Sequence, residues 1–126
     1  MLKLSQHQLD ALRQAQERGF RRRAWAHVKA EGAELGNPDD ARLMAAFDLS
    51  EFHVRQWGLG SEQVRIGLLK LAIREGDRPF RDPEFAAIMS DRTRNERVRL
   101  RLAAGQLQRH EGTRKTGPPR TRAAGP

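Results

Sequence analysis

The segment from Val64 to Ile73 is the feature that most restricts how this chain can fold. Its apolar side chains cover most of the circumference of a helix, although Arg65 and Lys70 interrupt the run. A helix that is apolar on nearly all sides must be surrounded by other elements, so we expect it at the centre of a helical bundle. The same stretch is too short and too charged to cross a membrane, which takes about 20 predominantly apolar residues.

Cap and turn signals divide the rest of the chain into helical stretches around this segment. Ser5 and Gln8 have the spacing of a capping box, which predicts a first helix over residues 6–31. Asn37 before Pro38 is typical of a helix start, and it predicts where the second helix begins. The complete set of structural cap and turn residues is Ser5, Pro38, Gly58, Ser61, Asp82 and Pro83. Together these signals predict an all-α fold, a compact bundle of about four helices.

The excess positive charge is confined to the last part of the chain. Residues 1–91 contain 14 Lys and Arg and 14 Asp and Glu, whereas residues 92–126 contain 10 and 2, which gives the +8 of the whole chain. This contrast predicts a neutral helical bundle over residues 1–91 and a basic helical extension over 92–109. A flexible, disordered tail rich in Pro, Gly and Arg is expected over 110–126. The fourth helix is therefore expected to run without a break into the extension.

Six residues are candidates for a binding surface, five of them arginines of the extension: Arg92, Arg94, Arg97, Arg99 and Arg101. At about 100° per residue, positions 92 and 99 share one side of a helix and positions 94, 97 and 101 another. Positive charge is therefore expected all round the rod, where it contacts an acidic partner or a phosphate backbone, or only keeps the helix in solution. The sixth candidate, Trp25, falls nearly opposite the apolar stripe of the first helix, as an exposed anchor for a partner would.

The residue types that carry catalysis or bind metals form no matching set in this sequence. No cysteine is present, and the four histidines have no i,i+3 or i,i+4 spacing for a shared metal ion. His27 lies on the apolar stripe and is expected to be a buried core histidine. We therefore expect no catalytic residue, no bound metal and no cofactor. A small enzyme is an alternative, and it requires His27 or His53 beside a carboxylate in a pocket.

The composition and the first residues bear on where the protein works. A hydrophobic content of 37% with a charged content of 32% is typical of a small helical domain in solution. Met1 to Gln6 lack the apolar segment of a signal peptide. These features predict residence in the cytoplasm without a membrane partner, and export by a route that needs no signal peptide is the alternative.

Three motifs resemble a known family. They occur in order as LSQHQLDALRQAQERGFRRRAWAHVK (4–29), WGLGSEQVRIGLLKLA (57–72) and FRDPEFAAIM (80–89). This set is similar to a family of small all-helical bacterial proteins encoded beside type VI secretion components, such as PAAR-type spike tips and large toxin effectors. The family shows an aromatic-Gly-aliphatic turn followed by an acidic residue, matched here by Trp57 to Leu59 and by Glu62. Phe85 stands where the family has a tryptophan.

The resemblance implies an accessory role without enzymatic activity, and it leaves adaptor, chaperone and immunity roles open. We therefore expect a non-catalytic protein-binding accessory of a secreted toxin effector or of its type VI delivery machinery. The expected partner is a protein, either the effector or a secretion component. The alternative is a nucleic-acid-binding protein that uses the Arg-rich extension, because clustered arginines neutralise phosphates.

Overall fold

The computed structural model describes the backbone of residues 5–116 and the side chains of residues 5–109. Within this range every regular element is helical, which confirms the all-α class, and six α-helices and one 3-10 helix replace the four stretches expected. The chain divides into two units between Asp39 and Asp40, and each is described by itself. This division differs from the boundary after residue 91 that the charge pattern suggested. No helix of the described residues is long and apolar enough to cross a membrane.

The first unit contains α1 (Gln6–Ala30) and the 3-10 helix η1 (Gly32–Leu35). The predicted capping box is present at its start, because the Gln8 amide donates to Ser5 Oγ at 3.1 Å and the Ser5 amide donates to Gln8 Oε1 at 2.8 Å. At the other end Gly36 takes the left-handed backbone conformation, with φ of 85°. This conformation terminates the helical turns.

The second helix starts later than predicted. α2 (Asp40–Trp57) begins at Asp40, so Pro38 lies outside the helix and Asn37 is not its N-cap. Asn37 has a φ of 50°, and its amide donates to the Gly32 carbonyl at 2.7 Å. Asparagine tolerates this left-handed conformation better than most residues. Its backbone therefore closes the turn around η1 instead of starting α2.

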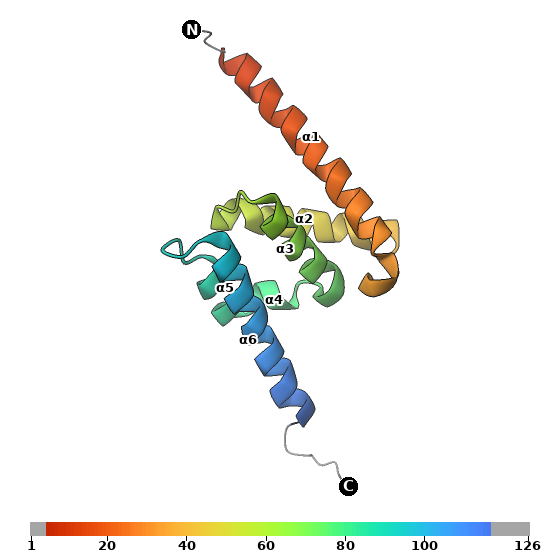
Figure 1. Cartoon of the computed structure of the whole chain (residues 1–126), viewed down its shortest axis with the longest axis vertical. Coiled ribbons are helices and arrows are strands. Elements are labelled where there is room, and N and C mark those ends of the chain that lie inside the picture. The colour runs from red at the N-terminus through yellow and green to blue at the C-terminus, as the bar shows by residue number, and fades with distance from the viewer. Residues whose placement is uncertain (1–4, 117–126) are drawn as a thin grey trace. The chain divides into compact units, whose positions relative to one another are not determined.

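The second unit is built on α2 and α3 (Glu62–Glu75), which lie side by side in Figure 1. Arg42 near the start of α2 donates to the carbonyl of Ile73 near the end of α3 at 2.6 Å, as an antiparallel pair requires. Arg65 and Glu51 form a largely buried ion pair between the same helices at 2.5 Å. α3 also contacts α4 and α6, and Leu68 is fully buried, so its expected central position holds within this unit.

The predicted fourth helix, which was to start at Asp82, is broken into two pieces, α5 (Pro83–Met89) and α6 (Glu96–Thr116), and a short helix α4 (Arg78–Arg81) precedes it. As predicted, Asp82 caps α5, because the Glu84 amide donates to Asp82 Oδ1 at 2.9 Å. The helix stops after α5 because Thr93 donates to the Asp91 carboxylate through both its amide and its hydroxyl. Such local bonds compete with helical hydrogen bonds.

α6 then starts on a new cap. The Val98 amide donates to Asn95 Oδ1 at 3.0 Å, which is the N-cap bond that begins a helix. α6 reaches Thr116, so the first residues of the expected tail 110–126 are helical and residues 117–126 lie outside the described range. Figure 1 shows α5 and α6 packed alongside each other.

An aromatic cluster packs α2 against α4 and α5 in the second unit. The rings of Trp57, Phe80 and Phe85 have centroids about 6 Å apart, at 6.1, 6.0 and 5.9 Å for the three pairs. All three side chains are buried. The cluster therefore fixes Trp57, and with it the beginning of the turn that leads from α2 to α3.

Candidate protein-binding surface

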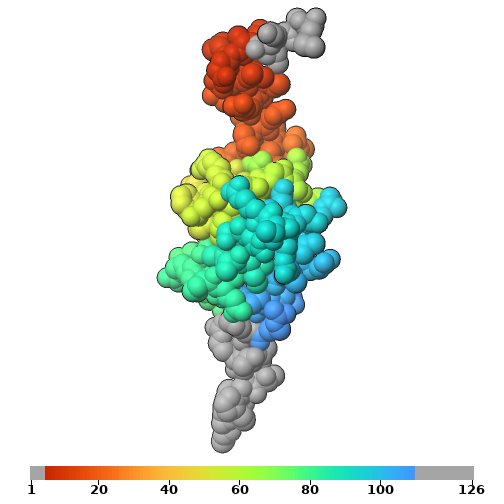
Figure 2. All heavy atoms as spheres, turned by 90° about the vertical axis from the view of Figure 1, so that its left-hand side faces the viewer, coloured from red at the N-terminus to blue at the C-terminus, as the bar shows by residue number. Residues whose placement is uncertain are grey.

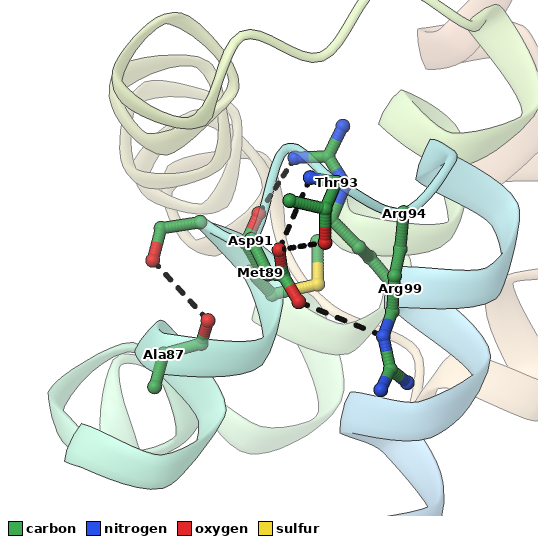
Figure 3. Close-up of polar contacts among 7 residues, drawn as sticks. Ala87, Met89, Asp91, Thr93, Arg94 and Arg99 are labelled. Atoms are coloured by element: carbon green, nitrogen blue, oxygen red, sulfur yellow. Dashed lines mark hydrogen bonds and ion pairs between the residues drawn. The ribbon is translucent and has the colours of Figure 1, made fainter.

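One side of the basic segment is bound to the turn between α2 and α3. Arg99 is only 5% exposed, and its Nη1 donates to the Trp57 carbonyl at 3.2 Å and to the Met89 carbonyl at 2.8 Å. Figure 3 shows the Arg99 side chain reaching the Met89 carbonyl beside the Asp91–Thr93 turn. A buried guanidinium that donates to two backbone carbonyls joins α2, α5 and α6 at one point.

Two neighbours of Arg99 bind the same turn. Glu96 Oε1 accepts hydrogen bonds from the amides of Gly60 and Ser61, each at 2.9 Å. Arg92 donates to the Gln56 carbonyl at 3.3 Å, and a Cβ atom added to Gly58 would lie 2.8 Å from the Arg92 guanidinium carbon. The residues Arg92, Glu96 and Arg99 are called the inner face below.

The inner face corrects the expectation that positive charge surrounds the helix. Arg92 lies in the turn before α6 and Arg99 lies within α6, and both side chains are turned toward the rest of the second unit. Arg99 is therefore buried and cannot meet a partner's surface, and Arg92, although exposed, is bound to the turn. Of the five predicted arginines, three are left for binding.

Those three begin the opposite side, called the outer face below: Arg94, Arg97, Arg101, Ala104 and Gln108. All three arginines and Gln108 are exposed, and Ala104 is half-buried. Arg94 Nε lies 3.5 Å from Asp91 Oδ2. Arg97 and Arg101 have no hydrogen-bond or ion-pair partner among residues 5–109.

Three further contacts hold α6 in place behind the outer face. Ala103 is fully buried, and Gln106 is 2% exposed with its Nε2 donating to Glu84 Oε1 of α5 at 2.9 Å. A Cβ added to Gly67 of α3 would lie 2.8 Å from Leu100 Cδ2, so the two helices approach closely there. The basic helix is thus a packed element of the fold and not a loosely attached extension. In Figure 2 the atoms of α5 and α6, in cyan and blue, form one continuous surface.

The turn before α6 carries a carboxylate, Asp91, that the surrounding hydrogen bonds hold in its ionised form. The side-chain and backbone hydrogen bonds from Thr93 lower the pKa of Asp91, with smaller contributions from the charges of Arg94 and Arg99. The ionised Asp91 keeps Arg94 close to the turn, as Figure 3 shows. Arg94 is consequently less available to a partner than Arg97 and Arg101.

Two expectations for the first unit are corrected. Trp25 is half-buried instead of exposed, with the Lys29 ammonium 5.6 Å from its ring centroid, and its contact with a partner stays a prediction. His27 is not a buried core residue, since 40% of its side chain is exposed and its Nε2 lies 2.8 Å from Glu31 Oε2. Trp25, opposite the apolar stripe, still meets Lys29 one turn further along α1, and His27, on the stripe, meets Glu31 in the same way.

The sequence singled out His53 only for the enzyme alternative, beside a carboxylate, and the structure places it among aromatic rings. Its ring lies 4.6 Å from the Trp57 centroid and stacks on Phe80 at 4.8 Å, so it extends the aromatic cluster. Burial lowers the pKa of His53 from its ordinary 6.5, and a hydrogen bond with the Gln56 side chain acts in the opposite direction. The ring is therefore neutral near pH 7 and packs as an aromatic side chain.

α2 also exposes two large apolar side chains. Met44 is 61% exposed, and Phe52 is 56% exposed. Asp48 lies between them on the exposed side of the helix. Exposed single apolar residues are common on protein surfaces and do not by themselves mark an interface.

Among the described residues, no group of three His, Asp or Glu side chains could hold a metal ion. The chain matches no protein-family model, no curated protein and no solved structure. The surface feature with the clearest chemistry is therefore the pair Arg97 and Arg101 on the outer face of α6. Guanidinium groups in such positions suit carboxylates and phosphates, both of which they bind in a bidentate manner.

Proposed function

We propose that this chain is a non-catalytic protein-binding accessory of a secreted bacterial toxin effector or of its type VI delivery machinery. It acts in the cytoplasm as an adaptor, chaperone or immunity protein, with the outer face of α6 as its contact surface. The resemblance of residues 4–89 supports the link to type VI secretion. The arrangement of α6 supports the mode of binding.

One observation carries the proposal: Arg97 and Arg101 are exposed and have no partner among residues 5–109, on a helix whose other side is fixed. Arg99 and Glu96 hold that helix to the turn between α2 and α3. A partner therefore does not have to order the backbone of α6, which lowers the entropic cost of association. Arginine is also enriched at protein interfaces, where its planar group pairs with carboxylates.

Co-expression of the full chain with the product of each neighbouring gene tests the proposal. We expect one product to co-purify with the chain, and the double variant Arg97→Glu/Arg101→Glu to lose it while remaining folded. The matched control is Arg18→Glu/Arg22→Glu, which changes two exposed arginines of α1 with the same four-residue spacing. The proposal would be contradicted if no product co-purified with the chain, or if only the control variant lost the co-purified product.

Nucleic-acid binding is the second candidate, and the net charge of +8 over residues 92–126 favours it. The three exposed arginines of the outer face, Arg94, Arg97 and Arg101, would give a log–log salt slope of about −2.7 on duplex DNA. Affinity for a duplex should then fall steeply with salt, and substituting Arg94, Arg97 and Arg101 by glutamine should remove that slope. Weak binding at physiological salt that the triple variant leaves unchanged would exclude this function for the outer face.

A further inference from the structure

We infer that the outer face of α6 receives an acidic α-helix of the partner, with carboxylates placed four residues apart along it. The inference rests on the proposed function, because it names the part of the partner protein that the face binds. It is drawn from the charge, spacing and rigidity of the face and from the side chains that continue it beyond the two arginines.

Charge determines the kind of group that the partner presents. Arg97 and Arg101 are exposed and have no acidic partner among the described residues. Two acidic side chains of α5 and α6 are engaged elsewhere, Glu96 with the amides of the turn and Glu84 with Gln106. The face therefore carries two uncompensated positive charges, and a partner lowers the free energy of the complex by bringing carboxylates to them.

Spacing determines the shape of the partner segment. Residues four apart on a helix lie on one side and are separated by a rise of about 6 Å. Arg97 and Arg101 have this separation, and the inner-face contacts of Glu96 and Arg99 keep it fixed. A second helix with Glu or Asp at positions i and i+4 repeats the same rise and can pair both charges at once.

The rest of the face leaves room for such a helix. From Arg97 to Gln108 the outer face is about 16 Å long, which is three turns of a helix. The small side chain of Ala104 follows the arginines, so the partner's helix can approach to the usual interaxial distance of about 8 to 10 Å. A nucleic acid suits this strip less well, because with Arg94 paired to Asp91 only two arginines are left for phosphates, which corresponds to a weak salt slope of about −1.8.

Binding of designed peptides to the full chain tests the inference. The matched probe is a helical peptide of about 20 residues, long enough to be helical in isolation, with Glu at i and i+4 on one side and Ala elsewhere. The comparison probe has the same composition and net charge, but its Glu residues are two apart, so that they face different sides. Dissociation constants are measured by fluorescence anisotropy at about 50 mM salt, where exposed charge pairs are weakly screened.

We expect the matched peptide to bind about tenfold tighter than the comparison peptide, as two exposed ion pairs allow. Arg97→Glu/Arg101→Glu should abolish this preference, and Arg97→Gln/Arg101→Gln should reduce it without reversing any charge. Arg18→Glu/Arg22→Glu should keep it. Circular dichroism and urea unfolding of each variant show that the fold is retained.

Three outcomes would overturn the inference: equal affinity for the two peptides, a preference that survives Arg97→Glu/Arg101→Glu, or tighter binding of a duplex of about 20 base pairs that this variant loses. The co-expression experiment separates the two proposals. A partner lost by Arg97→Glu/Arg101→Glu while the two peptides bind equally refutes the helical shape of the contact and leaves the proposed function standing.

Discussion

The two faces of α6 contain the same type of residue in opposite environments. Arg99 is buried and donates to two backbone carbonyls, whereas Arg97, two positions earlier, is exposed and has no partner among the described residues. Both contribute one positive charge to the net charge of the chain. The difference shows that a cluster of arginines cannot be assigned to binding by its charge alone, because part of it builds the fold.

The largest loss of stability is expected when Arg99 of the inner face is replaced and its hydrogen bonds are lost. Arg99→Met keeps the length of the side chain but leaves the Trp57 and Met89 carbonyls without their donor, and a buried unsatisfied acceptor costs about 1 to 3 kcal/mol. We expect the free energy of unfolding to fall by about 3 kcal/mol. Urea unfolding measures the change, with Arg97→Met as the control that should stay within about 0.5 kcal/mol of wild type. Equal losses in the two variants would mean that the faces do not differ.

A smaller effect is expected at Glu96, which caps the start of α3 from a distance in the sequence. Glu96→Ala removes the acceptor of the Gly60 and Ser61 amides and should cost about 1 to 2 kcal/mol in the same measurement. Glu96→Gln keeps an acceptor oxygen without the charge and should cost less. If Glu96→Ala unfolds at the wild-type urea concentration, the contact with the turn is not holding α6.

Two glycines are expected to change the stability in opposite directions when each is replaced by alanine. Gly58 lies under Arg92 with a φ of 65°, so Gly58→Ala is strained as well as crowded and should destabilise by about 1 to 2 kcal/mol. Gly105 is inside α6, and the nearest atom to an added Cβ is Arg109 Nη1 at 3.5 Å. Gly105→Ala should therefore stabilise the protein by about 0.5 to 1 kcal/mol. Two changes of the same sign in thermal unfolding would contradict this assignment.

The smallest effect is expected from the titration of His53, in the aromatic cluster next to Trp57. The pKa of His53 is lowered in the folded chain, so below pH 6.5 the unfolded chain takes up a proton that the folded chain resists. Stability is therefore lost as the pH falls from 6.5 to the folded pKa, and it is unaffected above that window. His53→Phe keeps the stacking and removes the titration.

The measurement for His53 is the free energy of unfolding from about pH 7.5 to pH 5.5, which spans the ordinary titration range of histidine. We expect the wild type to lose more stability over this range than His53→Phe, since the other titrating groups are common to both. Parallel curves for the two proteins would show that burial of His53 does not penalise its charged form.

Local signals in the sequence were sufficient for much of the fold. The caps at Ser5, Ser61 and Asp82 were predicted because an N-cap bond joins residues two or three apart, and the structure contains all three. The same logic could have located the start of α6, because Asn95 precedes Glu96 in the pattern of a cap and a first-turn acid. The unbroken fourth helix was expected because the arginine spacing was given more weight than this second cap.

The candidate surface could be predicted only in part. The grouping of Arg97 and Arg101 on one side follows from helical geometry and needs no structure, whereas Arg94 lies in the turn before α6. Which side of α6 faces the core cannot be predicted from that geometry, because Arg99 is held by the carbonyls of two other segments of the chain. Trp25 shows the same limit, since its half-buried position is not set by its angle on α1 alone.

The most direct test of the separation between the two faces is the affinity of the co-purified partner for Arg97→Glu/Arg101→Glu, measured on protein that unfolds at the wild-type urea concentration. We predict a dissociation constant at least about tenfold higher than for wild type, because two attractive charges become repulsive ones. An unchanged dissociation constant in this variant would contradict the assignment of the outer face of α6 to partner binding.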